Sequence, residues 1–282
     1  MPTLVHDGVE LAYDVAGPED TPPLVLAHGI SGARSTWHDI AADLARDHRV
    51  VTYDHRGHGG SSHALGTYDI RHWGDDLVAL LEQVVGEPAV LVGHSLGGVV
   101  SAQVIGDRPE LVRGALLEDP PLFVGSAAAL ETTPFGFIFP LMRDSFREMR
   151  GRGASLDEYV AAAASVPALN GAGTVGDLLG PDGVRRHGQA TKDFDPEALE
   201  AALTGAALGA FDPRRPLPVP VHVLRAELFA AFRPEDEAPF RAVNPHATVE
   251  LVPGASHLIH DEQPALVTDR IRSFAKRSFG HT

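Results

Sequence analysis

The chain has 282 residues, a length that suits one large α/β domain with an insertion or two small domains. Its formal net charge of -15 at pH 7 argues against binding of nucleic acid or anionic membranes through a basic face. The chain contains no cysteine, which excludes disulfides, thiolate catalysis and cysteine-ligated metals.

Short apolar strands alternate with helical segments through the first 120 residues. Residues 9–15 alternate apolar and polar side chains, as an exposed antiparallel strand does. Short apolar runs predict buried parallel strands at 23–27, 49–53, 88–92 and 112–117, and helices are expected at 37–45, 70–85 and 99–105. This alternation predicts a mostly parallel sheet that is covered by helices on both faces.

Ser95 stands at the centre of the sequence Gly93-His94-Ser95-Leu96-Gly97, between an apolar strand and a helical stretch. A serine on a sharp strand-to-helix turn has cramped backbone angles, and the flanking glycines leave room around it. Such a turn lifts the hydroxyl above the sheet, near helix N–H groups that stabilise a developing oxyanion. The pattern therefore predicts that Ser95 is a nucleophile.

The strand–helix alternation stops between residues 122 and 212, where helical segments are expected at 135–149 and 156–164. The first of these segments is too rich in phenylalanine for a disordered linker. We interpret 122–212 as a helical lid inserted after the sixth strand, and 1–121 with 213–282 as the core domain. The α/β pattern resumes with strands at 219–224 and 248–252 and helices at 235–243 and 258–274.

Four landmarks in chain order make this sequence similar to the α/β-hydrolase superfamily over nearly its whole length. They are His28-Gly29, Asp54-x-Arg56-Gly57-x-Gly59, Gly93-x-Ser95-x-Gly97 and, after the last strand, His257. The resemblance implies an eight-stranded, mostly parallel α/β-hydrolase sheet with His257 as general base. It also implies an oxyanion hole made by the backbone N–H groups of Leu96 and Ile30, with Gly29 shaping the loop. We expect the nearby His260 to be solvated or to cap a helix.

The carboxylate of the triad has three candidates. Members of the superfamily usually carry it after the seventh strand, where Phe229 stands here, with Glu227 two residues earlier. In haloalkane dehalogenases and zearalenone-type lactone hydrolases it follows the sixth strand, and Asp119 matches that layout, just before a proline-containing turn. Adjacent strand residues point to opposite faces, so only one of Glu118 and Asp119 can face His257. We predict Asp119, with Glu227 as the second candidate and Glu118 as the third.

A Ser–His–acid set with an oxyanion hole transfers acyl groups to water. We expect hydrolysis of a carboxylic ester or lactone whose largely apolar, small-to-medium substrate binds between lid and sheet. Alternatives on the same triad are a C–C bond hydrolase, a thioesterase and a cofactor-free haloperoxidase or perhydrolase. An alternative of another class is a hydrolase-fold ligand-binding protein with little turnover. An epoxide hydrolase or dehalogenase would need aspartate in place of Ser95.

We expect no cofactor and no metal. His55, His58 and His63 lie close in sequence, but histidines three apart on a glycine-rich loop do not converge like paired ligands on a helix. The N-terminal residues show no basic start followed by an apolar stretch, and no apolar run approaches the length of a membrane span. We therefore expect a cytoplasmic protein that binds a small molecule, without nucleic-acid or membrane partners. The oligomeric state stays open.

Overall fold

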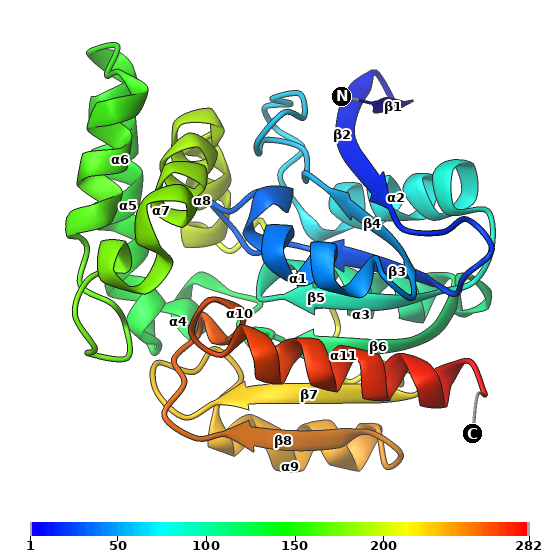
Figure 1. Ribbon diagram of the computed structural model, residues 1–282. Coiled ribbons are helices and arrows are strands. Elements are labelled where there is room, and N and C mark those ends of the chain that lie inside the picture. The colour runs from blue at the N-terminus through cyan, green and yellow to red at the C-terminus, as the bar shows by residue number, and fades with distance from the viewer. Residues whose placement is uncertain (1, 281–282) are drawn as a thin grey trace.

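An eight-stranded sheet, in the order β1-β2-β4-β3-β5-β6-β7-β8, forms the centre of the computed structural model, which describes residues 2–280 (Figure 1). The strands are β1 (Thr3–His6), β2 (Val9–Ala16), β3 (Pro23–Ala27), β4 (Arg49–Tyr53), β5 (Ala89–His94), β6 (Val112–Glu118), β7 (Val221–Ala226) and β8 (Thr248–Val252). Strands β3 to β8 run parallel, whereas β2 pairs antiparallel with β1 and β4. The predicted eight-stranded, mostly parallel α/β sheet is therefore confirmed.

Helices occupy most of the connections between these strands. They are η1 (Arg34–Trp37), α1 (His38–Leu44), α2 (Ile70–Leu80), η2 (Leu81–Val85), α3 (Leu96–Asp107), η3 (Pro109–Leu111), α4 (Ala127–Glu131), α5 (Pro134–Gly151), α6 (Leu156–Ser165), α7 (Val175–Asp193), α8 (Glu197–Leu203), α9 (Pro234–Val243), α10 (Ile259–Glu262) and α11 (Pro264–Ser278). Across residues 2–280, no helix combines the length and the apolarity that crossing a bilayer requires.

Both faces of the sheet are buried, because successive strand side chains point to opposite sides. In β3, Leu24 and Leu26 belong to an apolar cluster that includes α1 and α11, whereas Val25 and Ala27 belong to a cluster that includes α2 and α3. Each of these four side chains is at most 1% exposed. Since helices cover both faces, functional side chains are expected in the loops that follow the carboxyl ends of the strands.

Helices α4 to α8 lie in the segment between β6 and β7, on the side to which the arrowheads of β5 and β7 point (Figure 1). Helices α5 and α6 match the segments expected at 135–149 and 156–164. Helices α4, α7 and α8 were not expected as separate elements. A capping box in which Thr174 and Asp177 bond each other's backbone N–H begins α7, and that sequence signal could have revealed it.

The single helix predicted over residues 258–274 is wrong, because two helices occupy this segment. Helix α10 ends at Glu262, and Gln263 leaves the helical region with φ -133° and ψ 56°. Pro264 then begins α11, as proline does well at the first helical position, where no N–H is required. The break leaves a short helix, α10, directly after His257.

Two further differences from the sequence-based prediction concern strands β1 and β7. Strand β1, which pairs with β2, was not singled out from the sequence. Strand β7 begins at Val221 instead of residue 219, because Pro218 and Pro220 have no N–H to donate to a neighbouring strand. Neither change alters the order of the loops at the carboxyl edge of the sheet.

Candidate active site

Ser95 forms a sharp turn between β5 and α3, with φ 50° and ψ -115°. Few non-glycine residues adopt such angles, and the surrounding structure must hold them in place. A Cβ on Gly93 would lie 2.3 Å from the carbonyl oxygen of Gly97, so only glycine fits there. The Ser95 N–H donates to the carbonyl oxygen of Glu118 at 2.9 Å. The strand-to-helix turn expected at Ser95 is thus present, and β6 braces it.

Asp119 and His257 meet at the carboxyl edge of the sheet. Oδ2 of Asp119 lies 2.6 Å from Nδ1 of His257. The Asp119 side chain is fully buried and also accepts the N–H groups of Ala226 at 3.3 Å, Ala231 at 2.7 Å and Phe232 at 3.2 Å. These three donors belong to the end of β7 and the loop after it. Because an ionised carboxylate only accepts, Nδ1 of His257 carries the proton and Nε2 is left as the basic nitrogen.

The other two candidate carboxylates contact residues other than His257. Glu227 is exposed and accepts the N–H of Gly254 at 2.7 Å. Glu118 contacts His260, with 2.8 Å between Oε1 and Nδ1. Over residues 2–280, neither glutamate makes a hydrogen bond or ion pair with His257. Asp119 is the candidate carboxylate that the structure brings to the His257 ring.

The prediction that His260 is solvated or caps a helix is wrong. It is 3% exposed, and its Nε2 lies 2.8 Å from the Oγ1 of Thr36. Burial lowers the pKa of His260, but the carboxylates of Glu118 and Asp261 more than offset that effect and raise the pKa to about 9. No sequence pattern signals this pair, since Glu118 and His260 are far apart in the chain.

The loop after β3 packs directly against the Ser95 turn. A Cβ on Gly29 would lie 3.2 Å from the Cβ of Ser95, so this glycine allows the close approach. Within residues 2–280, the backbone N–H groups of Ile30 and Leu96 have no hydrogen-bond partner. Leu96 is the first residue of α3, where N–H groups lack partners within the helix. Both N–H groups are therefore available to an oxygen of a bound molecule.

Ser95 and His257 line the same narrow cavity, which has a volume of about 50 Å³. The other lining residues are all apolar: Pro121, Val124, Leu130, Phe135, Phe139, Ala202, Gly205, Ala207, Leu208 and Ala231. Most of them come from the segment between β6 and β7. The Phe135 ring lies 4.8 Å from the His257 ring, measured between centroids. A bound molecule would therefore meet one hydroxyl, one imidazole and an apolar wall.

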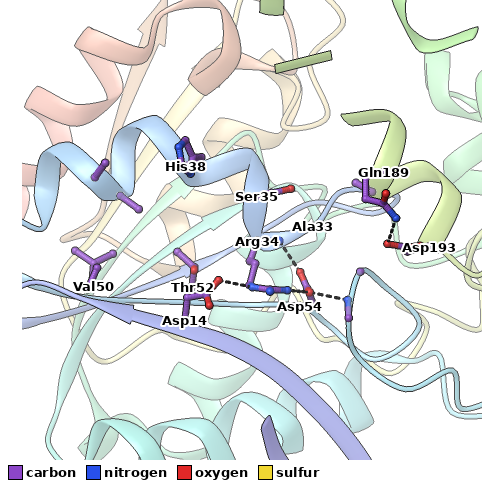
Figure 2. Close-up of a pocket in the computed structure, with 16 residues that line it drawn as sticks. Asp14, Ala33, Arg34, Ser35, His38, Val50, Thr52, Asp54, Gln189 and Asp193 are labelled. Atoms are coloured by element: carbon purple, nitrogen blue, oxygen red, sulfur yellow. Dashed lines mark hydrogen bonds and ion pairs between the residues drawn. The ribbon is translucent and has the colours of Figure 1, made fainter. Parts of the chain in front are cut away.

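A larger cavity of about 600 Å³ lies elsewhere, over β2, β4, α1 and α7 (Figure 2). Arg34 lies in it between two carboxylates: its Nε donates to Asp14 at 2.6 Å, and its guanidinium pairs with Asp54. Neither Ser95 nor His257 lines this cavity. Its charged groups are engaged with one another, so cavity size alone does not mark the site of chemistry.

Among residues 2–280, the histidine-rich loop after β4 contributes to no group of three candidate metal ligands. Within the part of the chain that the structure describes, one group places three candidate ligand atoms within 4.8 Å of one another, and it consists of His94, Glu118 and His260. The nitrogens of His260 are bonded to Glu118 and Thr36. A Cβ on Gly29 would lie 2.7 Å from Nδ1 of His94, so the backbone fills that side. These contacts fit an ion pair better than a metal centre.

Four histidines around the site are buried and uncharged at neutral pH. Burial is the main cause, and it lowers the pKa of His28 to about 4 and that of His58 to about 3. Burial also holds the pKa of His55 and of His94 well below the usual value. All four side chains are at most 5% exposed. Protonating any of them requires placing a charge in a closed interior.

Lowering the pH from about 7.5 to about 5 is expected to destabilise the fold by about 2 kcal/mol for each of His28 and His58. An unfolded histidine takes up its proton near pH 6.5, whereas the folded chain resists protonation until about pH 4 and 3. The unfolded state then binds more protons, so stability present above pH 6.5 is lost as the pH falls. Urea unfolding followed by circular dichroism at both pH values measures this. Equal unfolding free energies would contradict it.

The chain resembles known hydrolases in sequence and in fold. A family model described as "Alpha/beta hydrolase family" matches residues 24–270. The bifunctional esterase/perhydrolase DCH of Acinetobacter calcoaceticus is 34% identical over 122 residues, which cover 42% of this chain and 44% of that protein. The 3-oxoadipate enol-lactonase 2 of Acinetobacter baylyi is 31% identical over 127 residues, covering 45% of this chain and 48% of that protein. Each alignment thus spans less than half of the curated relative.

Similarity of fold extends over nearly the whole chain. The crystal structure of the enol-lactonase from Burkholderia xenovorans LB400 superposes with a TM-score of 0.73 at 20% sequence identity. The match covers 97% of this chain and 99% of that one. The segment between β6 and β7 thus falls within a fold that solved structures share.

Proposed function

This chain belongs to the alpha/beta hydrolase family, and from that premise we propose that it hydrolyses a carboxylic ester or lactone through an acyl-enzyme on Ser95. The observation that carries the proposal is the 2.6 Å contact between Asp119 and His257, on the cavity that Ser95 also lines. A nucleophile, a base and a buried carboxylate at one cavity are the parts that acyl transfer to water requires.

The proposed catalytic groups act in the following way. His257 takes the proton of Ser95 through Nε2 while the Ser95 oxygen attacks the substrate carbonyl, and then passes that proton to the leaving group. Asp119 holds the His257 ring and stabilises its cation. The N–H groups of Leu96 and Ile30 bind the oxyanion. Water, with His257 as base, then releases the acid and restores Ser95.

The relatives support the same class of substrate. Their names describe an esterase that is also a perhydrolase and an enol-lactonase, so both act on esters, cyclic or open. Because those alignments cover less than half of each relative, ester or lactone hydrolysis by this chain is part of the proposal.

The cavity wall favours a small, uncharged and largely apolar acyl group. Apart from His257, none of the residues that line it carries an ionisable side chain. A carboxylate on the acyl group would find no cationic side chain along the apolar wall and would lose its hydration. We propose that the segment between β6 and β7, which contains helices α4 to α8, acts as a lid over this site, since most of the apolar residues that line the cavity belong to that segment.

A fluorophosphonate probe tests the proposed function. The intact chain should gain one covalent phosphonyl group at Ser95, found by mass spectrometry, and should hydrolyse short p-nitrophenyl esters or simple lactones. The His257→Ala variant should lose both properties, because Ser95 then lacks its base. If the folded wild-type chain is not labelled and turns over none of a panel of esters, lactones and thioesters, the proposal is wrong.

Phe139→Ala is expected to shift the preference toward longer acyl chains, because Phe139 lines the cavity and packs 5.5 Å from the Phe135 ring. The ratio of kcat/KM for p-nitrophenyl hexanoate over butyrate should rise about 10-fold. Phe137→Ala is the matched control, since Phe137 lies on the same helix and is 75% exposed. An unchanged ratio in Phe139→Ala, or an equal shift in Phe137→Ala, would argue against this wall as the acyl pocket.

A further inference from the structure

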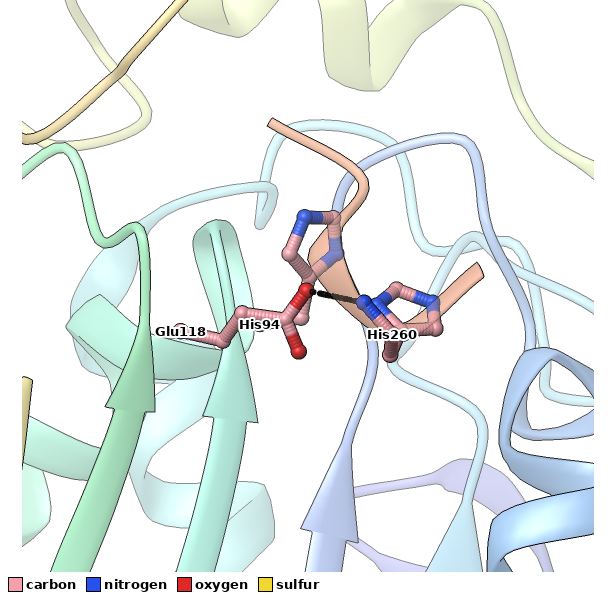
Figure 3. A group of neighbouring side chains, drawn as sticks. All are labelled: His94, Glu118 and His260. Carbon is pink, nitrogen blue, oxygen red and sulfur yellow. Dashed lines mark hydrogen bonds and ion pairs between the residues drawn. The ribbon is translucent and has the colours of Figure 1, made fainter. Parts of the chain in front are cut away.

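We propose that Glu118 is a positioning residue: through its buried contact with His260 it fixes the segment that carries His257, and with it the approach of the His257 ring to Ser95. This inference rests on the proposed function. Figure 3 shows His94, Glu118 and His260 converging at the carboxyl edge of the sheet, with the contact between Glu118 and His260 drawn as a dashed line.

Two consecutive carboxylates at the end of β6 hold two histidines of one short segment. Asp119 contacts the ring of His257, and Glu118 contacts His260, three residues further on. Oε1 of Glu118 is 2.8 Å from Nδ1 of His260 and also accepts the backbone N–H of His260 at 2.9 Å. Glu118 therefore binds both the side chain and the backbone at the start of α10, the helix that begins two residues after His257.

Glu118 also contacts the turn that carries the proposed nucleophile, Ser95. Its carbonyl oxygen accepts the N–H of Ser95 at 2.9 Å. The residue before Ser95 completes the link, because Nε2 of His94 lies 2.9 Å from the carbonyl oxygen of His257 and so donates to it. One residue of β6 thus anchors the nucleophile turn through its backbone and the base segment through its side chain.

The Glu118–His260 contact is a buried ion pair. Glu118 is fully buried and His260 is 3% exposed, and the pKa of His260, although lowered by burial, rises to about 9 beside Glu118 and Asp261. At neutral pH the imidazolium donates through Nδ1 to Glu118 and through Nε2 to Thr36 on η1. The polar groups around the ring are His94 at the end of β5, Asp261 and Glu262 on α10, Thr36 and Ser35 on η1, Asp39 on α1, and Arg186 and His187 on α7.

Glu118 and His260 lie outside the cavity of the proposed triad. Neither Glu118 nor His260 lines the cavity that contains Ser95. Glu118 and His260 therefore act through the segment that they hold and not by lining that cavity. A misplacement of about 1 Å in a catalytic group lowers rates by about 10²-fold, which sets the expected size of the effect.

The test uses Glu118→Gln, which keeps the shape and an acceptor for the His260 N–H but removes the charge. We expect kcat for p-nitrophenyl butyrate to fall about 10- to 100-fold with KM within about twofold, and fluorophosphonate labelling to slow in parallel. In the wild type, kcat/KM should decline above about pH 9, where His260 loses its proton. In Glu118→Gln this decline should begin at least about one pH unit lower, because the charge that raises the pKa is gone.

Glu250→Gln is the matched control. Glu250 forms a partly buried glutamate–histidine pair elsewhere in the fold, with 3.3 Å between its Oε2 and the Nε2 of His222 on β7. The kcat and the pH profile of the Glu250→Gln variant should match those of the wild type. If Glu118→Gln lowers only the melting temperature, with kcat and the pH profile unchanged, Glu118 has a structural role alone and the positioning proposal is overturned.

A measurement on the wild-type chain covers the case in which Glu118→Gln does not fold. Nitrogen-15 NMR of the histidine rings at about pH 7.5 should show both nitrogens of His260 protonated, with titration near pH 9. A neutral His260 would overturn the proposal. This readout does not depend on turnover, so an unreactive Ser95 alongside a charged His260 would point to failure of the proposed function alone.

Discussion

Ser95→Ala is expected to lower kcat/KM for a short p-nitrophenyl ester by about 10⁶-fold, the largest effect of any single change in this chain. The variant lacks the oxygen that forms the acyl-enzyme, and within the described residues no other hydroxyl lines the cavity that His257 lines. A residual acceleration of about 10³ over the reaction in water should persist, because the N–H groups of Leu96 and Ile30 remain. Steady-state kinetics with active-site titration measures the loss.

Ser165→Ala is the control for the Ser95 variant. Ser165 is exposed at the end of α6, and its hydroxyl donates only to a backbone carbonyl oxygen nearby. Its removal should leave kcat and fluorophosphonate labelling unchanged. If Ser95→Ala keeps more than about a hundredth of the wild-type activity while folded, the reaction does not pass through Ser95.

Asp119→Asn is expected to lower kcat by about 10⁴-fold, whereas Glu227→Gln should leave it within a few-fold. Asparagine can present its NH₂ group to Nδ1 of His257, which favours the tautomer whose Nε2 carries the proton. In that tautomer His257 cannot accept the proton of Ser95. Comparing kcat for the two variants on one ester measures the difference.

The stability of Asp119→Asn must be measured alongside its activity. The Asp119 carboxylate accepts three backbone N–H groups as well as the His257 ring, and asparagine has one acceptor oxygen to offer. Unsatisfied buried donors should destabilise the fold by about 1–3 kcal/mol. Melting curves separate this effect from lost chemistry. If a folded Glu227→Gln loses turnover while Asp119→Asn retains it, the acid lies after β7 and the layout proposed here is wrong.

Much of the fold could be predicted from short-range patterns. Strands β3 and β4 have the predicted limits, since a short apolar run marks a buried strand clearly. The turn at Ser95 was predictable because its glycines, strand and helix are contiguous in sequence. The break after α10 was also encoded in Pro264, but the apolar periodicity of residues 258–274 masked it.

The partners of the carboxylates were harder to predict because they depend on contacts between distant segments. Alternation along β6 separates Glu118 from Asp119, but which of the two meets His257 depends on where the loop after β8 crosses the sheet. The same applies to His260, whose partner precedes it by 142 residues. Sequence motifs name the residue types of such a site, and only the packed chain pairs them.

The loop after β7 has a consequence for redesign. Ala231 and Phe232 reach Asp119 through backbone N–H groups alone, and Leu228 and Phe229 are exposed. The path of this loop is therefore constrained, whereas the identity of its exposed side chains is not. Phe229 even sits at φ 48°, an angle that asparagine or glycine adopts more readily. Residues 228 and 229 are therefore two permissive positions for sequence libraries on the loop that holds Asp119, provided that the loop length is kept.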